Sequence, residues 1–283
     1  MIKVLNTGFY SSIQDFGRNH YLEFGVPYSG VMDRKAASFA NALLGNKEDE
    51  AVLEMTMTGA KLQFQVETFM VISGADMSPK LNDYPIGLNK VVALKPNDVL
   101  SFGKLNSGFR CYLAIWGGFK SETIMGSKSM CQNITEQFKL FKNDELIVCD
   151  YSTDIIYKNA SVRFNVSYLT SDIVEVLKGP EFDLLSDDQK NQLLNKSFTI
   201  SKDNNRMAYQ LEENLKNNLK PIITSGVLPG TVQLTPSGKL IILMRDCQTT
   251  GGYPRVLQVK ESSIDILAQK FTGNHIKFKF ISS

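Results

Sequence analysis

The amino-acid sequence predicts a mainly β protein with a few short helices. Apolar and polar residues alternate along several runs, which is the pattern of strands that bury one face. Clusters of glycine, proline, asparagine and aspartate separate these runs, as turns between strands require. Only three segments carry helical periodicity, and they do not alternate regularly with the strands. A barrel or sandwich is therefore favoured over a doubly wound sheet.

The clearest strand patterns have a period of two. In 62–66, apolar Leu62, Phe64 and Val66 alternate with polar residues. Each run of this kind is expected to form a strand. The other alternating runs are 162–166 and 276–280, and shorter β-rich runs cover 69–73, 99–102, 111–115 and 241–244.

Three helices are expected. The first lies in 32–46, where apolar residues recur at helical spacing, Asp33 can cap the start and Gly45 can close the end. The second follows Ser186, which has capping-box spacing with Gln189. The third follows Ser262 and carries apolar residues along one side.

The composition limits the class of protein. The 283 residues are 43% hydrophobic, and 31 basic residues nearly balance 29 acidic ones, for a formal net charge of +2. This balance gives no electrostatic reason to expect nucleic acid or an anionic membrane as a partner. No apolar stretch reaches the roughly 18–20 residues of a membrane span, and no signal peptide precedes the first strand. We expect a cytoplasmic protein.

Cysteine and histidine usage argues against a metal site. The four cysteines contain no C-x-x-C pair, and the chain has only two histidines. A structural zinc site needs about four such ligands. We therefore expect reduced thiols and no metal in this chain. Cys247 has no histidine close in sequence and is expected to be a small buried residue, not a nucleophile.

A polar stretch, 149–161, is the expected domain boundary, because it follows a strand-like run and contains few apolar residues. The predicted domains are 1–160 and 161–283.

The loop "RDCQTTGGYPRV" (245–256) is richer in polar groups than a two-residue turn requires. Glycines allow a positive φ or a close approach of another group, and consecutive N–H groups can form a concave anion site. With threonine hydroxyls and Arg255 at its rim, the loop is predicted to grip a carboxylate or phosphate. The alternative is a tight hairpin between 240–244 and 256–259.

A second polar region covers 11–33. Its carboxylates, its histidine and Arg18 could carry out acid–base chemistry. Each has a plainer alternative: Asp33 as a helix N-cap, His20 as a solvated loop residue, and Asp15 as an ion-pair partner of Arg18.

Two further positions complete the candidates. Glu54 and Thr56 share one side of a predicted strand, where they line either a pocket or the solvent face. Arg206 offers a planar fork suited to a carboxylate or phosphate, and its alternative is an ion pair. Neither a P-loop nor a helix-opening G-x-G-x-x-G occurs, so any use of ATP must rest on an unusual site or on a partner.

Taken in order along roughly 1–270, the motifs resemble the KipA family, whose members include the C component of 5-oxoprolinase, allophanate hydrolase subunit 2 and the carboxyltransferase part of urea carboxylase. The motifs are SSIQDFGR, FGVPYSGVMD, FANALLGN, LEMTMTGAKLQF, SGADM, YLAIWGGF, GPEFD, NRMAYQL, LPGTVQLTPSG and DCQTTGGYPRV.

The resemblance implies two cyclophilin-like β-barrel domains and an enzyme of several components. The partners would be a KipI-like B component and a LamB/YcsF-like A component, and the complex would open 5-oxoproline, a small lactam, to L-glutamate with ATP. Catalytic roles are assigned to Asp15, Asp33 and Arg206. Substrate binding is assigned to Gln14, Arg18, Glu54, Thr56, Gln233, Gln248, Thr249, Thr250, Gly251, Gly252 and Tyr253.

Two alternatives accompany this function. The chain could be a KipA-type regulator that antagonises a KipI-like inhibitor of a sensor kinase, or a carboxyltransferase that acts on urea or an amide with a biotinylated partner. The chain itself has no Met-Lys-Met biotin-attachment sequence. Two departures from the family pattern are Cys247, where many relatives carry a charged residue, and the glycine-poor segment 126–141.

Overall fold

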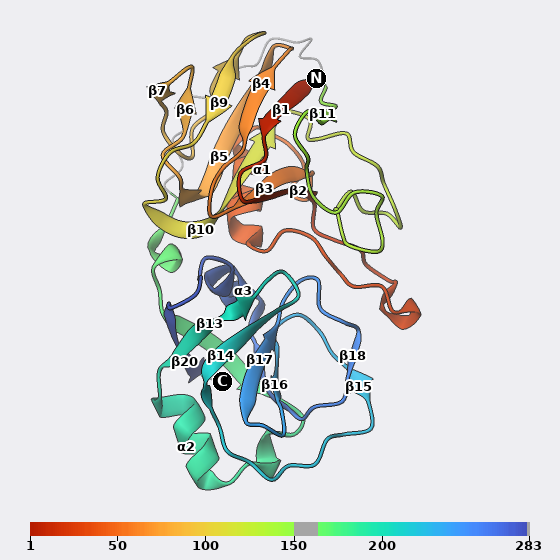
Figure 1. Ribbon diagram of the computed structural model, residues 1–283, viewed down its shortest axis with the longest axis vertical. Helices are drawn as coiled ribbons and strands as arrows, with labels where there is room; N and C mark the ends of the chain where they lie inside the picture. Colours follow the sequence, from red (N-terminus) through yellow and green to blue (C-terminus); the bar gives the residue numbers. More distant parts are fainter. Residues whose placement is uncertain (150–163, 282–283) are drawn as a thin grey trace. The chain divides into compact units, whose positions relative to one another are not determined.

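The computed structural model describes residues 1–149 and 164–281. The chain forms two compact units (Figure 1). Unit 1 comprises Met1–Gly17 and Asp33–Thr170, and unit 2 comprises Arg18–Met32 and Ser171–Ser283. The boundary expected near residue 160 lies outside the described residues, and the two-domain division at that point stays a prediction.

Unit 1 is built from two antiparallel sheets. In sheet order, the six-stranded sheet contains β11 (Glu145–Leu146), β1 (Ile2–Asn6), β4 (Lys61–Phe64), β9 (Val99–Ser101), β6 (Lys80–Leu81) and β7 (Tyr84–Pro85). The five-stranded sheet contains β2 (Tyr10–Gln14), β3 (Val52–Thr56), β10 (Ser107–Ile115), β5 (Thr68–Asp76) and β8 (Val92–Leu94).

The core of unit 1 follows from the alternation in its strands. Leu62 and Phe64 of β4 are buried, while Lys61 on the same strand is exposed. Apolar residues of both sheets join one buried cluster. Helix α1 (Arg34–Leu43) packs on β5 and β10. The expected caps of this helix are confirmed, because Asp33 accepts a hydrogen bond from the Ala36 N–H and Gly45 has a φ of +69°.

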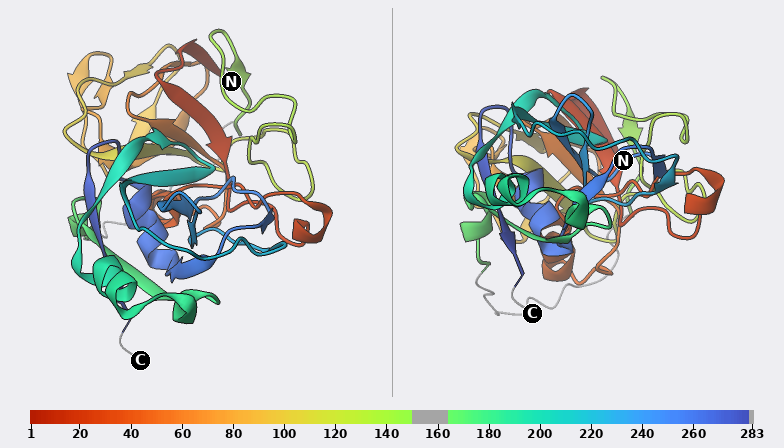
Figure 2. Two further views of the ribbon diagram at one scale, coloured as in Figure 1. Left: turned by 60° about the horizontal axis from the view of Figure 1, so that its bottom comes forward. Right: turned by 90° about the horizontal axis from the view of Figure 1, so that it is seen from below.

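Unit 2 is a closed barrel (Figures 1 and 2). Its strands, in order around the barrel, are β12 (Ile173–Lys178), β19 (Arg255–Val259), β16 (Thr231–Leu234), β17 (Lys239–Leu243), β14 (Ala208–Asn214), β13 (Phe198–Asn204) and β20 (His275–Phe280). β12 and β20 pair in parallel. A separate two-stranded ribbon joins β15 (Ser225–Gly226) to β18 (Thr250–Gly251).

Short helices complete unit 2. α2 (Asp187–Asn195) has the predicted capping box between Ser186 and Gln189, and α3 (Glu261–Ala268) begins next to the predicted start at Ser262. Both helices contribute apolar side chains to the barrel core. The 3₁₀ turn η1 (Leu22–Phe24) lies at the tip of the 18–32 loop (Figure 2), and η3 (Phe182–Leu184) follows β12.

The mainly β class with short helices is confirmed, and every predicted strand but one is present. The exception is 162–166, of which residues 162 and 163 lie outside the described part. Residues 164–166 form no strand: Phe164 stacks on Phe39 of α1, with ring centroids 4.2 Å apart, and Val166 is the N-cap of the 3₁₀ turn η2 (Ser167–Leu169). Within the described residues, no helix has the length and apolar character needed to cross a membrane.

Candidate functional site

The glycine-threonine loop does not form a tight hairpin, so that interpretation is wrong. β16 lies between β17 and β19 in the barrel, and the chain from Leu243 to Arg255 therefore passes around β16. On its way it forms β18, which pairs with β15 in a ribbon. The N–H of Val227 donates to the carbonyl of Thr249 at 3.0 Å, and that of Ile222 donates to Gly252 at 2.9 Å.

The two loop glycines are explained by close approach and not by backbone conformation. Neither Gly251 nor Gly252 has a positive φ. A Cβ on Gly251 would lie 2.3 Å from Nε2 of Gln233, and one on Gly252 would lie 3.3 Å from the carbonyl oxygen of Ile222. A side chain at 251 would therefore require the Gln233 amide to shift, because that amide occupies the space of its Cβ.

A groove of about 660 Å³ lies beside this loop, entirely within unit 2. Thr249 and Thr250 line one part of it, and its other walls come from the 18–32 loop and from the ribbon. The remaining lining residues are Leu22, Glu23, Gly25, Gly226, Val227 and Leu228. Thr249 and Thr250 thus face an open groove, and the role of the loop in binding a ligand stays a prediction.

The main-chain N–H groups of the loop are available as donors. Those of Gln248, Thr249, Gly252 and Tyr253 have no acceptor among the residues of 1–149 and 164–281. Gln248 is exposed and Tyr253 is 39% exposed. Main-chain N–H groups without an acceptor can donate to a bound anion or carbonyl oxygen.

Gln233 lies directly beneath the loop on β16. Its side chain is only 2% exposed, and its Nε2 has no hydrogen-bond partner within the described part of the chain. A buried amide N–H₂ without an acceptor costs about 1–3 kcal/mol. Gln233 thus adds an unused donor close to those of the loop.

Apolar contacts hold the loop and ribbon against the outside of the barrel. Val227, Leu243 and Cys247 form a small buried cluster beside Ala208 and Ile241. Burial raises the pKa of the Cys247 thiol to about 12, with the nearby Asp246 carboxylate as the next cause. The thiol is therefore protonated at neutral pH, as expected for a packing residue.

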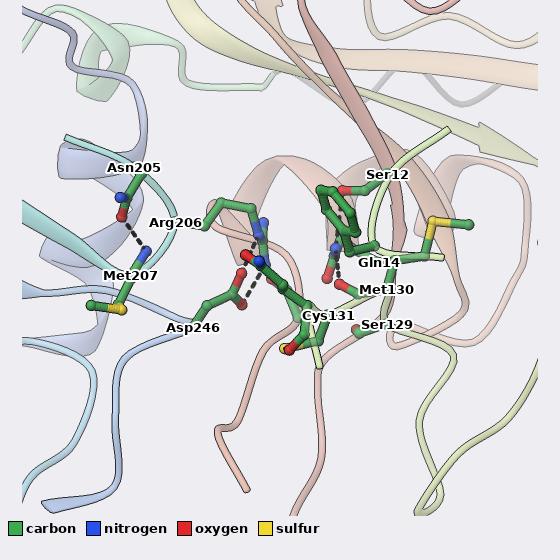
Figure 3. A network of polar contacts seen from close by, with 12 residues as sticks. Ser12, Gln14, Ser129, Met130, Cys131, Asn205, Arg206, Met207 and Asp246 are labelled. Atoms are coloured by element: carbon green, nitrogen blue, oxygen red, sulfur yellow. Dashed lines mark hydrogen bonds and ion pairs between the residues drawn. The ribbon is translucent and has the colours of Figure 1, made fainter. Parts of the chain in front are cut away.

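Arg206 holds the start of the loop instead of an open anion site. Its Nε and Nη2 donate to the two carboxylate oxygens of Asp246 at 2.8 and 3.0 Å, and Nη2 also donates to the Gly30 carbonyl at 2.6 Å (Figure 3). The Arg206 residue is 7% exposed. The ion-pair interpretation is thus confirmed for Arg206, and Asp246 is the partner that sequence reasoning missed.

Arg18 and Arg245 also belong to unit 2 and are buried. The N–H of Arg18 donates to the Tyr28 carbonyl at 2.7 Å, which ties the two ends of the 18–32 loop together. Arg245 forms a bidentate pair with Glu261, and its carbonyl accepts from the Ser29 N–H. The 18–32 loop is therefore anchored to the strand that enters the glycine-threonine loop.

Asp15 and Gln14 lie in unit 1, where they fix the segment after Gly126. Asp15 accepts from the hydroxyls of Ser127 and Ser129, both at 2.6 Å, and from the N–H of Lys128 at 2.6 Å. Gln14 donates to Ser12 and to the carbonyl of Met130 (Figure 3). The glycine-poor segment is thus held by the side chains of β2 and the residue after it.

Asp33 is a buried N-cap with two tyrosine partners. Besides capping Ala36, its carboxylate accepts from the Tyr168 hydroxyl at 2.8 Å, and its N–H donates to the Tyr112 hydroxyl at 2.8 Å. Burial, together with the Glu54 and Asp33 carboxylates, raises the pKa of Tyr112 well above its usual range. The N-cap interpretation of Asp33 is confirmed.

Glu54 and Thr56 do not form a solvent face, because Glu54 is fully buried and Thr56 is 6% exposed. Across the sheet, Ser12, Glu54, Tyr112 and Ser73 lie directly opposite one another on four neighbouring strands. Arg110, on the same strand as Tyr112, lies 3.8 Å from the Glu54 carboxylate. This buried polar row alternates with core residues of the opposite face.

Sequence reasoning missed Arg110 and Tyr112, although a signal was present. In 110–115 the polar residues Arg110 and Tyr112 alternate with Cys111 and Leu113. Once the pairing of β10 with β3 is known, this alternation places Arg110 and Tyr112 on the same face as Glu54. The pairing itself joins residues about 60 positions apart, which no local pattern reveals.

The candidates thus separate into two kinds. Asp15, Asp33, Gln14 and Arg206 already make hydrogen bonds that fix the fold. The loop residues and Gln233 carry donors that are not used within the described chain. Such donors, with threonine hydroxyls at the groove, can bind a carboxylate, a phosphate or the oxygen of an amide.

Comparisons with known proteins agree with this fold. The sequence model of the protein family described as carboxyltransferase domain, subdomain A and B, matches residues 24–280. The chain is 28% identical to the C component of 5-oxoprolinase from Escherichia coli (strain K12) over 283 residues, which is 98% of this chain and 90% of that protein. It is 41% identical to urea amidolyase of Lachancea kluyveri over 128 residues, which is 45% of this chain and 7% of that protein.

A solved structure is similar over nearly the whole chain. The urea carboxylase of Kluyveromyces lactis matches 99% of this chain with a TM-score of 0.87 and 26% identity, and the match covers 27% of that chain. The resemblance inferred from the motifs is confirmed. Since the matched residues 24–280 include both the barrel and the groove loop, the chain belongs to the family of carboxyltransferase domains with subdomains A and B.

Proposed function

We propose that this chain is the C component of an ATP-dependent 5-oxoprolinase, which opens 5-oxoproline to L-glutamate together with a KipI-like B component and a LamB/YcsF-like A component. Its similarity to the C component of a known 5-oxoprolinase covers 98% of this chain and 90% of that protein, which supports this role. The match to urea amidolyase covers only 7% of that protein. The relative's name, which designates one subunit, also supports a heteromeric complex.

The observation that carries the proposal is the groove beside the glycine-threonine loop. Thr249 and Thr250 line the groove, and their hydroxyls, with the unused N–H of Thr249, can donate to an anionic small molecule. 5-Oxoproline carries a carboxylate and a lactam oxygen, and both accept hydrogen bonds. The groove is therefore suited to bind and orient the substrate or its phosphorylated form.

ATP is needed on chemical grounds. A lactam is a poor electrophile, and phosphorylation of its oxygen would make the ring carbon attackable by water. The sequence contains no P-loop, so we place ATP binding in the complex and not at a defined site of this chain. The role proposed for this chain is to bind the anionic substrate and orient it.

Reconstitution of the three-component complex tests the proposal. The purified A and B components are mixed with 5-oxoproline and ATP, and glutamate is measured with and without this chain. We expect turnover only in its presence. Equal turnover without it would exclude the proposed role. Thr250→Val should raise the KM for 5-oxoproline, whereas Thr272→Val, at an exposed turn away from the groove, serves as the matched control.

A second candidate is carboxyl transfer to urea or an amide from a biotinylated partner. The similarity to urea carboxylase over 99% of the chain and the family match favour it. This function predicts that the chain, supplied with a carboxylated biotin carrier protein, forms a carboxylated urea product without ATP in the transfer step. No product with urea or simple amides would leave the opening of 5-oxoproline as the better account.

A further inference from the structure

We propose that Glu181 and Arg255 are positioning residues for the groove: Glu181 fixes the Arg255 guanidinium, and Arg255 holds the β15/β18 ribbon so that the groove keeps its shape. This inference rests on the proposed function, because the groove is the predicted binding site. The sequence alone predicts charge from Arg255 at the loop rim. The structure contradicts that expectation, because the donors of Arg255 are already engaged.

Glu181 binds both the side chain and the main chain of Arg255. Its Oε2 accepts from the Arg255 N–H at 2.8 Å and from Nε at 3.0 Å, while Oε1 accepts from Nη2 at 2.8 Å. The side chains of Arg255 and Glu181 are 18% and 15% exposed. A bidentate, charge-assisted pair in a partly buried position fixes the plane of the guanidinium.

The surrounding backbone is shaped for this pair. The N–H of Glu181 donates to the Arg255 carbonyl at 3.1 Å, which closes a reciprocal contact. A Cβ on Gly179 would lie 2.2 Å from the Arg255 carbonyl oxygen, so only glycine lets the segment before Glu181 run this close to β19. The pair is therefore built into the connection between β12 and η3.

The remaining nitrogen of Arg255 reaches the ribbon. Nη1 donates to the hydroxyl of Ser225 at 2.6 Å and to the carbonyl of Gly226 at 3.1 Å. Ser225 and Gly226 form β15, which pairs with Thr250 and Gly251 of β18. One guanidinium thus joins a barrel strand to the ribbon.

The ribbon in turn forms much of the groove. Gly226, Val227 and Leu228 line it from the β15 side, and Thr249 and Thr250 line it from the β18 side. Arg255 itself does not line the groove. We therefore assign it a role through other residues: if β15 shifts, the threonines and the loop N–H groups shift with it.

Three substitutions separate positioning from general stability. Arg255→Met removes the guanidinium, Ser225→Ala removes one contact to β15 but leaves the pair with Glu181 intact, and Arg255→Lys keeps the charge but loses the fork. Lys260→Met is the matched control, since it breaks an exposed ion pair with Glu175 immediately after the same strand.

The first readout is hydrogen–deuterium exchange of the free chain, which needs no activity. We expect the N–H groups of Ile222 and Val227, which bond to the loop, to exchange about tenfold faster in Arg255→Met and severalfold faster in Ser225→Ala. Strands β14 and β17 should exchange as in the unmodified chain. Unchanged exchange at Ile222 and Val227 in both variants would overturn the inference, as would equal acceleration throughout the barrel.

The second readout is the split between KM and kcat in the reconstituted complex. We expect Ser225→Ala to raise the KM for 5-oxoproline about tenfold, which corresponds to about 1.4 kcal/mol, with little change in kcat. In Arg255→Lys the KM for 5-oxoproline should also be raised, because lysine keeps the charge but loses the fork. A KM equal to that of the unmodified chain would mean that charge alone matters and would refute positioning. A complex inactive with the unmodified chain would refute the proposed function instead, and the exchange experiment would still decide the inference.

Discussion

Gly251 offers a sharp test of the packing beneath the loop, because a single added methyl group would meet Gln233. The Cβ of alanine at 251 would lie 2.3 Å from Nε2 of Gln233, and Val227 Cγ1 and Gln233 Cδ would both lie at 3.4 Å. Carbon contacts are normally about 3.5–4.0 Å, so the Gln233 amide must move by about 1 Å in a site that is nearly closed. Gly251→Ala is therefore expected to force Gln233 out of its rotamer.

The magnitude follows from two opposing effects. Overpacking a buried site costs about 1–3 kcal/mol, while replacing glycine by alanine stabilises by about 0.4–1 kcal/mol through the unfolded chain. Gly226→Ala, on the paired strand, gains the second effect alone, since no atom lies within 4 Å of its added Cβ. Because both variants gain the second effect, it cancels in their difference, and we expect Gly251→Ala to be about 1–3 kcal/mol less stable than Gly226→Ala.

Urea denaturation followed by circular dichroism measures this difference, and glutamate formation by the reconstituted complex measures its effect on the groove. In a Gln233→Ala background the clash is removed, so the two alanine variants should become equally stable. Equal stability in the unmodified background, or a difference that persists without the Gln233 side chain, would contradict the reasoning.

Three further predictions concern the fixed polar residues. Asp33→Ala should lower stability by about 1–3 kcal/mol, because the helix loses its cap and the buried Tyr168 hydroxyl loses its acceptor. Asp33→Asn should retain most of the stability. A strong loss of turnover in the asparagine variant alone would instead indicate an acid–base role for Asp33. Arg206→Ala should destabilise by about 3–5 kcal/mol by leaving Asp246 without its partner, so a variant inactive but fully stable by denaturation would assign Arg206 to the substrate. The Arg255 guanidinium lowers the pKa of Glu181 below its ordinary 4.5. The stabilisation from this ion pair is therefore present above pH 4.5 and is lost as the pH falls through the lowered pKa. Glu181→Gln should flatten the acid side of the plot of stability against pH, and parallel plots for the variant and the unmodified chain would argue against the pair.

Much of the fold is predictable because it depends on local patterns. The alternation in 61–64 and 275–280 reports which side chains face the core, and the caps at Asp33 and Ser186 report where helices begin. The strand predicted at 162–166 fails in its described part because stacking of Phe164 on Phe39 and the turn at Val166 replace pairing with a neighbour. Alternation reports a buried face and cannot specify what buries it.

The site is less predictable because it depends on pairing between distant residues. The composition of 249–254 predicts a ligand loop, but it predicts a tight turn equally well. The local sequence does not reveal that β16 lies between β17 and β19, which excludes that turn. Arg206 meets Asp246 across 40 positions, and Arg255 meets Glu181 across 74. Charged residues of this kind look alike in sequence whether they bind a partner in the fold or a ligand.

The distribution of used and unused hydrogen-bonding groups bears on which chemistry this chain supplies. Asp15 accepts from three neighbours of one segment, and Asp33 accepts from a helix N–H and a tyrosine, so neither carboxylate is placed as a mobile proton carrier. At the glycine-threonine loop, the groups without a partner in the described residues are donors: the loop N–H groups and the Gln233 amide. Such donors can bind and polarise an oxygen but cannot remove a proton from water, and among the residues that line the groove only Glu23 carries a carboxylate. Asp15→Asn should therefore lower the stability of the 127–129 segment more than it lowers kcat in the reconstituted complex.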